Sequence, residues 1–149
     1  MTALARWRRL GPARRVLLPR AVAALCAASL KVRLLPFSRI VAGLGSMMPP
    51  RPYALSEAFA PTDLKRAKDV RWAVDAAARH LPFECACLAR ALAAHALCRS
   101  CGLAPVLHMG AKAGQQGGAE THAWLTAAGI GVTGYPLPPD MVEVGCFCA

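Results

Sequence analysis

The clearest structural signal in this sequence is an amphipathic pattern over residues 62–81, which predicts an α-helix. Within it, apolar residues recur at every third or fourth position: Leu64, Ala67, Val70, Val74, Ala77 and Leu81. This spacing places them on one stripe of an α-helix, and such a stripe packs against a core. Thr62 or Asp63 caps the start, and Pro82 ends the helix because proline disfavours helical geometry in the preceding residue.

The segments after this helix change from helical to extended character. A second helix is expected to begin near Cys87 and to stop at Gly102. Three short strands are expected beyond it, over Val106–Met109, His122–Leu125 and Ile130–Thr133. A loop is expected over Ala111–Gly118 and a hairpin turn at Gly129, whereas residues 135–149 follow no pattern that assigns an element. Helices followed by strands indicate an α+β fold.

The N-terminal part of the chain also has helical character. Helix propensity is strongest over Arg20–Ala28, Pro36 interrupts it, and a short helix is expected over Ser38–Leu44. Residues 46–61 are rich in proline and indicate a linker. We therefore expect one compact domain, with a basic helical segment and linker over residues 1–61 and a core over residues 62–149.

The positive charge lies in the first third of the chain. The formal net charge is +10; residues 1–56 hold ten Lys and Arg and no acid, whereas residues 57–149 hold eight of each sign. A basic segment can bind nucleic acid, an anionic membrane or an acidic protein, but the neutral remainder argues against a nucleic-acid partner. The apolar run Ala21–Leu30 has ten residues, where a membrane span needs about 20, so we expect no stable membrane insertion.

The number of cysteines bears on the redox state of the cellular compartment in which the chain would fold. Their number is seven, which cannot close into intramolecular disulfides alone. The preferred interpretation is a reducing compartment, the cytoplasm, with most thiols packed as small apolar groups. The pair Arg14-Arg15 before an apolar run resembles an export signal, but Pro19 and Arg20 interrupt the run, so a basic amphipathic helix is preferred.

One cysteine has the setting of a nucleophile. Cys87 lies where the second helix begins, and the partial positive charge of a helix N-terminus stabilises a thiolate. His122 lies on a later strand, with Trp124 on the same face because strand side chains alternate. A cysteine at a helix start, followed by a histidine on a strand, is the chain order of thiol proteases and transglutaminases. Cys87 and His122 are therefore the candidate nucleophile and base.

Other residues leave alternatives open. Cys85 could be the nucleophile, although it lies two residues before the helix and gains less from the helix dipole. The one C-x-x-C, Cys98 to Cys101, has zinc-ligand spacing, and a second pair could come from Cys85/Cys87 or Cys146/Cys148. Without a second C-x-x-C, we expect no metal and no cofactor. Three histidines are interpreted as packed or solvent-facing: His80, His95 and His108.

Several segments together resemble a known family. They are Leu34–Phe37 (LLPF), Arg79–Phe83 (RHLPF), Cys87–Leu92 (CLARAL), Arg99–Leu103 (RSCGL), Leu107–Gly110 (LHMG) and His122–Leu125 (HAWL). Over residues 20–134 the chain resembles the transglutaminase-like leader peptidase of lasso-peptide biosynthesis, the protease part of the "B protein". The resemblance implies a cysteine peptidase core, papain- or transglutaminase-like, with a helical N-terminal layer.

The resemblance also implies a reaction and a set of residues. The family cuts the leader from a ribosomally made precursor, near a threonine close to the end of the leader, and an ATP-dependent lasso cyclase then joins the freed amine to an Asp or Glu side chain. The nucleophile maps to Cys87 and the base to His122. The family's third catalytic residue is an acid, but Gly134 stands at its expected place, so that residue stays unassigned. Asp140 and Glu143 are the nearest downstream acids.

The residues before the expected core bear on how a leader peptide would be recognised. Residues 1–61 lack the alternating strand pattern of the family's leader-recognition module, a small winged-helix-like domain. We therefore expect a separate small leader-recognition protein. Arginines of the N-terminal segment could help to dock it, or an acidic leader: Arg6, Arg8, Arg9, Arg14 and Arg15. The alternatives are a non-enzymatic basic partner-binding module and a Cys-ligated zinc-binding regulator.

Overall fold

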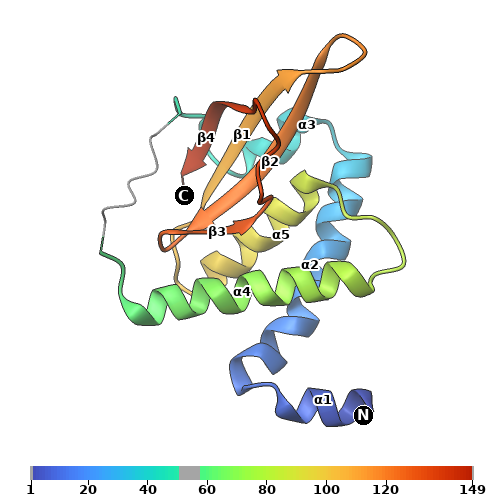
Figure 1. Cartoon of the computed structure of the whole chain (residues 1–149), viewed down its shortest axis with the longest axis vertical. Helices are drawn as coiled ribbons and strands as arrows, with labels where there is room; N and C mark the ends of the chain where they lie inside the picture. The colour runs from blue at the N-terminus through green and yellow to red at the C-terminus, as the bar shows by residue number, and fades with distance from the viewer. Residues whose placement is uncertain (1, 51–57, 149) are drawn as a thin grey trace.

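A computed structural model describes residues 2–50 and 58–148, and Figure 1 shows how its elements are arranged. Over these residues the helices come first: α1 (Ala3–Arg9), α2 (Pro12–Leu34), α3 (Phe37–Ala42), α4 (Pro61–His80) and α5 (Cys87–Ser100). The strands follow: β1 (Val106–Ala113), β2 (Ala119–Ala127), β3 (Ile130–Thr133) and β4 (Val142–Cys148). This order confirms the expected α+β class. Part of the expected linker, residues 51–57, lies outside the described residues.

The strands form one antiparallel sheet in the order β3-β2-β1-β4. Strand β1 pairs with β2 along its whole length, from Val106 opposite Thr126 to Ala113 opposite Ala119. The loop expected over Ala111–Gly118 is therefore wrong for residues 111–113, which continue the strand. Small residues gave no local strand signal there, but pairing with β2 satisfies their main-chain hydrogen bonds.

Strand β4 occupies the stretch that the sequence left unassigned. Its Val142 and Val144 are exposed, whereas Glu143 between them turns toward β1. A half-buried strand usually places apolar side chains toward the protein and polar ones toward solvent, and these three residues do the reverse. A shift in register between Met109 and Gly110 further breaks the alternation. The strand is therefore set by its pairing with β1 and not by its own pattern.

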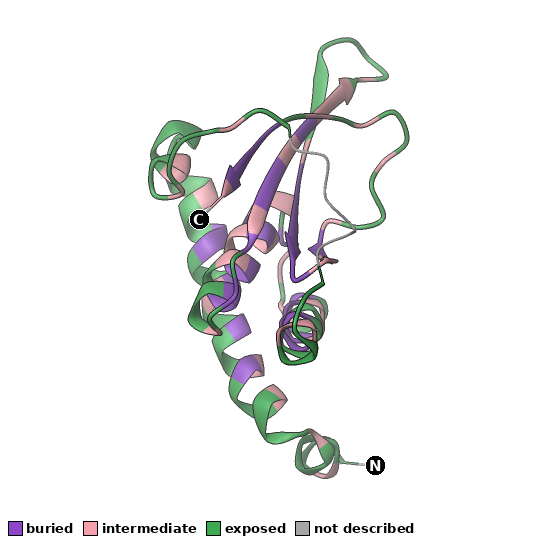
Figure 2. Ribbon diagram, turned by 90° about the vertical axis from the view of Figure 1, so that its left-hand side faces the viewer, coloured by how far each residue is buried: buried purple, intermediate pink, exposed green. Residues whose placement is uncertain are grey.

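Helices α4 and α5 lie against one face of the sheet, and α2 forms a further layer behind them. Helix α2 packs on α4 and α5, and α5 lies against β2. The largest fully buried side chains come from both layers and include Leu25, Val70, Val74, Leu107 and Leu125. Figure 2 shows the buried residues gathered between helices and sheet, while α1 stands exposed at the far end. The apolar stripe expected on the helix over residues 62–81 is the face of α4 that enters this core.

The helix boundaries differ from expectation in three places. Helix α2 runs unbroken through Pro19 and is much longer than Arg20–Ala28, because its buried residues continue on both sides of that range. The short helix after Pro36 begins at Phe37 and ends at Ala42. Helix α4 begins at Pro61, whose fixed φ suits the first helical position, so Ala60 is the N-cap instead of Thr62 or Asp63. Within the described ranges, no helix is both long and apolar enough to cross a membrane.

Candidate active site

Cys87 is the first residue of helix α5. The preceding N-cap, Ala86, has extended backbone geometry and offers no side chain to the helix end. The first turn of α5 also holds no acid. The free main-chain N–H groups of this turn therefore carry an uncompensated partial positive charge beside Cys87. The side chain is half-buried and borders a cleft of about 330 Å³, so it is open to a substrate.

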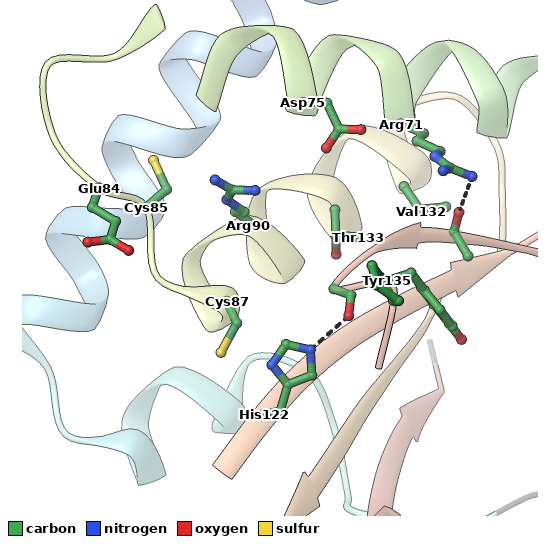
Figure 3. A pocket seen from close by; sticks show the side chains of 13 residues that line it. Arg71, Asp75, Glu84, Cys85, Cys87, Arg90, His122, Val132, Thr133 and Tyr135 are labelled. Atoms are coloured by element: carbon green, nitrogen blue, oxygen red, sulfur yellow. Dashed lines mark hydrogen bonds between the residues drawn. The ribbon is translucent and has the colours of Figure 1, made fainter. Parts of the chain in front are cut away.

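His122 projects from strand β2 into the same cleft. Its Nε2 lies 2.8 Å from the carbonyl oxygen of Gly134. Because a carbonyl only accepts hydrogen bonds, Nε2 carries the proton, and in the neutral imidazole Nδ1 is left as an acceptor. Figure 3 shows this second ring nitrogen on the side of the imidazole that faces the Cys87 sulfur. The arrangement is that of a base oriented to take a thiol proton.

The group that orients His122 is therefore a main-chain carbonyl. Gly134 has a φ of +84°, and a Cβ built on it would lie 2.6 Å from Cβ of Trp124. No side chain fits at this position without a shift of the backbone. The two acids considered from the sequence lie elsewhere: Glu143 accepts a hydrogen bond from Nδ1 of His108 at 2.6 Å, and Asp140 is exposed in the turn before β4. The sequence could not reveal the carbonyl, because every residue has one.

The two sides of the Cys87–His122 pair differ in polarity. The 330 Å³ cleft carries charged side chains of both signs: Arg71, Asp75, Glu84 and Arg90. A second cleft of about 450 Å³ also borders Cys87 and His122, and its walls are mostly apolar, including Phe37, Met47, Leu88, Met109 and Val144. An extended chain crossing the pair would meet polar walls on one side and apolar walls on the other.

The remaining cysteines have different surroundings. Cys85 borders the charged cleft but is itself buried, with the Ser29 hydroxyl 4.0 Å from its sulfur. Burial, with a smaller effect from Cys101, raises the pKa of the Cys98 thiol to about 12, which keeps it protonated near neutral pH. In the part of the chain that the structure describes, no three His, Cys, Asp or Glu side chains gather closely enough to hold a metal ion.

The three histidines set aside in the sequence are not equivalent. On α4, Nδ1 of His80 donates to the carbonyl of Ala76 at 2.7 Å, and the ring is exposed. His95 is half-buried on α5, where burial and the nearby Arg99 lower its pKa. His108 is buried on β1 and has hydrogen-bond partners at both ring nitrogens. None of the three borders the cleft of Cys87 and His122.

In this site a thiol lies at the start of a helix, and a histidine from the neighbouring sheet shares its cleft. This arrangement defines the class of cysteine–histidine proteins with a papain- or transglutaminase-like core. A comparison with protein-family models matches residues 31–144 to the transglutaminase-like superfamily, which is well over half of the chain. The chain therefore belongs to the transglutaminase-like superfamily. Comparisons with curated proteins and with solved structures found no match.

Proposed function

We propose that this chain is a cysteine peptidase that uses Cys87 as nucleophile and His122 as base. The hydrogen bond from Nε2 of His122 to Gly134 carries the proposal, because it leaves Nδ1 free to accept the Cys87 proton. The superfamily includes cysteine peptidases, and the cleft beside the pair is open enough for a peptide. A free thiol is a condition of this chemistry, and Cys87 is a free cysteine. We accordingly propose a reducing compartment, the cytoplasm, as the place of action.

The proposed reaction has two stages. His122 takes the thiol proton of Cys87, the thiolate attacks the scissile carbonyl, and the imidazolium protonates the leaving amine. Water then attacks the thioester, His122 takes its proton, and the Cys87 thiol is released. The main-chain N–H of Cys87 belongs to the unpaired donors at the start of α5 and is one proposed donor to the oxyanion.

We propose more specifically that the substrate is the leader of a lasso-peptide precursor. The support is the sequence resemblance, carried above all by the CLARAL and HAWL segments around Cys87 and His122. Cleavage near a threonine at the end of the leader would free an amine. A separate ATP-dependent cyclase would then join that amine to an acidic side chain of the product peptide.

We also propose that a separate leader-recognition protein docks near α1. An apolar groove of about 630 Å³ there is bordered by Trp7, Trp72 and the side chains of Arg6 and Arg9. A basic groove of about 400 Å³ adjoins it and contains Arg9, Arg14, Lys65 and Lys68. The combination suits an acidic partner that offers an apolar anchor.

An ion-pair network centred on the buried Asp69 supports this end of the molecule. Asp69 on α4 accepts hydrogen bonds from Arg14 and Lys65, both at 2.9 Å. Burial by itself raises the pKa of Asp69, but the hydrogen bonds and charges of Lys65 and Arg14 outweigh it and lower the pKa overall. Because Arg14 belongs to α2, this network fixes α2 against α4 beside the basic groove.

The peptidase is tested by cleavage of full-length precursor, followed by mass spectrometry. Cys87→Ala should abolish leader removal, because no nucleophile remains, whereas the matched control Cys85→Ala should keep most of it. In wild type, a limiting amount of iodoacetamide should label Cys87 before Cys85. Cleavage that survives in Cys87→Ala, or labelling of Cys85 first, would contradict the assignment.

The absence of an acid at position 134 favours one alternative, a non-enzymatic partner-binding module. A carbonyl stabilises an imidazolium less than a carboxylate does, so a chain retained only for binding could carry this change. Such a module would keep its affinity for the recognition protein in Cys87→Ala and would show no enhanced labelling of Cys87. A zinc-binding regulator, the other alternative, would instead copurify with one zinc ion per chain.

A further inference from the structure

A buried polar cluster lies behind the Cys87–His122 pair and takes no part in the proposed chemistry. Its centre is His108 on β1, whose side chain is only 3% exposed. Nδ1 of His108 lies 2.6 Å from Oε1 of Glu143 on β4, and Nε2 lies 2.8 Å from Oγ1 of Thr126 on β2. The cluster therefore links three adjacent strands, β4, β1 and β2, through one imidazole ring.

This cluster is not a second catalytic triad. A hydroxyl, an imidazole and a carboxylate in a row have the composition of one, but Thr126 is only 2% exposed. No substrate can reach its hydroxyl, so the hydroxyl cannot act as a nucleophile. Nδ1 of His108 pairs with the Glu143 carboxylate and Nε2 pairs with the Thr126 hydroxyl, so both ring nitrogens have a hydrogen-bond partner. The cluster fixes the position and plane of the His108 ring.

That ring in turn supports Trp124. His108 lies opposite Trp124 in the β1–β2 register, and the two rings stack with centroids 5.5 Å apart and planes within 7°. The other neighbour of the indole is His122, with centroids 6.0 Å apart and an interplanar angle of 22°. Trp124 therefore stacks with both histidine rings and connects His108 to His122.

Two glycines leave the space that Trp124 needs. A Cβ on Gly110 would lie 2.7 Å from Cζ3 of the indole, and a Cβ on Gly134 would lie 2.6 Å from Cβ of Trp124. Gly134 is also the residue whose carbonyl accepts from His122. Trp124 therefore contacts both the imidazole and the residue that orients it.

We propose that His108, held by Glu143 and Thr126, is a positioning residue that fixes the imidazole plane of His122 through Trp124. The inference rests on the proposed function of the Cys87–His122 pair. Its physical reason is the acceptor at Gly134: a neutral carbonyl makes a weaker hydrogen bond to an imidazole than a carboxylate does. The orientation of His122 therefore depends more on the ring stacked behind it than it would with an acid at position 134.

The test uses Thr126→Val and His108→Leu in the full chain. Thr126→Val has a similar shape but removes the hydroxyl on Nε2, and His108→Leu removes both hydrogen bonds and the stacked ring. Leader cleavage should show kcat lowered about ten- to hundredfold in His108→Leu, the size of loss that a misplacement near 1 Å causes, with KM nearly unchanged. Thr126→Val should lie between it and wild type, and Thr126→Ser, which restores a hydroxyl, should recover most of the rate.

A second readout does not depend on the peptide substrate. The rate of Cys87 alkylation reports whether His122 still accepts the thiol proton, and it should fall in the same order as kcat. In a Trp7→Phe/Trp72→Phe background, Trp124 is the only tryptophan, and its fluorescence anisotropy should fall as the ring becomes mobile. The control is Gln116→Ala, at an exposed residue between β1 and β2, and it should change none of these quantities.

The possible results separate the two proposals. If wild type alkylates rapidly at Cys87 but cuts no precursor, the peptidase proposal fails while the alkylation series still decides the role of His108. If Thr126→Val and His108→Leu lower the unfolding temperature but leave kcat and the alkylation rate unchanged, the cluster is only structural and the inference is overturned. If His108→Leu does not fold, the comparison of Thr126→Val with Thr126→Ser decides alone.

Discussion

The Nε2 atom of His122 lies 2.8 Å from the carbonyl oxygen of Gly134, so a main-chain group orients the candidate base of this protein. Unlike a carboxylate, this acceptor cannot be removed by mutating its side chain or by acidification. It can be displaced only by moving the backbone of the turn after β3. The acceptor on Nε2 is thus the carbonyl of a glycine whose φ is +84°.

Restoring an acid at this position is expected to damage the protein. Gly134→Asp places a Cβ against Trp124 and forces an L-residue to a positive φ, which should cost about 1–3 kcal/mol from backbone strain alone and more from the clash. Urea denaturation should show the loss. Gly117→Asp is the control, because its φ is also positive (+83°) but its Cβ would meet nothing within 4 Å. A Gly134→Asp protein of full stability and higher activity would show that an acid fits after all.

Leader cleavage should need the recognition protein and should be sensitive to salt. At low enzyme concentration, adding that protein should accelerate cleavage, and the gain should shrink from 50 mM to about 300 mM salt because screening shortens the range of attraction. Arg6→Glu/Arg9→Glu should reduce the gain at low salt without changing the rate of the enzyme alone. Equal rates with and without the recognition protein would argue against a divided system.

Removing metal should not change the activity. Because Cys98 is buried with a raised pKa and no described trio of ligands exists, incubation with EDTA should leave the cleavage rate within about twofold of the untreated protein. Elemental analysis should find much less than one zinc per chain. Stoichiometric zinc, with inhibition by the chelator, would support the zinc-binding regulator instead.

Acidification should destabilise the fold through His95. Its Nε2 is buried with no hydrogen-bond partner among the described residues, and burial and Arg99 lower its pKa below the usual value of 6.5. The unfolded chain takes up a proton below pH 6.5 while the folded chain does not. The stabilisation is therefore complete above pH 6.5 and is lost as the pH falls, by at most about 1.4 kcal/mol per pH unit.

This effect can be measured by chemical denaturation between pH 7.5 and 5.5. His95→Gln removes the titrating group and should flatten the dependence of the unfolding free energy on pH. Gln116→Ala, which replaces an exposed residue that does not titrate, should leave the slope as it is in wild type. A slope that His95→Gln does not change would assign the acid sensitivity to other groups.

Some of the candidate site follows from local signals in the sequence. Pro82 ends one helix, so the next helix can begin at Cys87, and the start of any helix carries a partial positive charge. The strand around His122 shows the alternation that places Trp124 on the same face, and the two rings do stack. These features depend on neighbours within a few residues, which is why the sequence alone could predict them.

The rest depends on contacts between segments far apart in the chain. Glu143 was an available acid by sequence position, but the β1–β4 register sets it opposite Gly110 and on His108. Every residue has a carbonyl, and only the turn after β3 brings that of Gly134 to His122. The sequence by itself predicted most of the helices and a candidate Cys87–His122 pair, because propensity and periodicity are local. The tertiary structure decided what holds the base, because strand register and turn geometry are fixed only when the sheet is assembled.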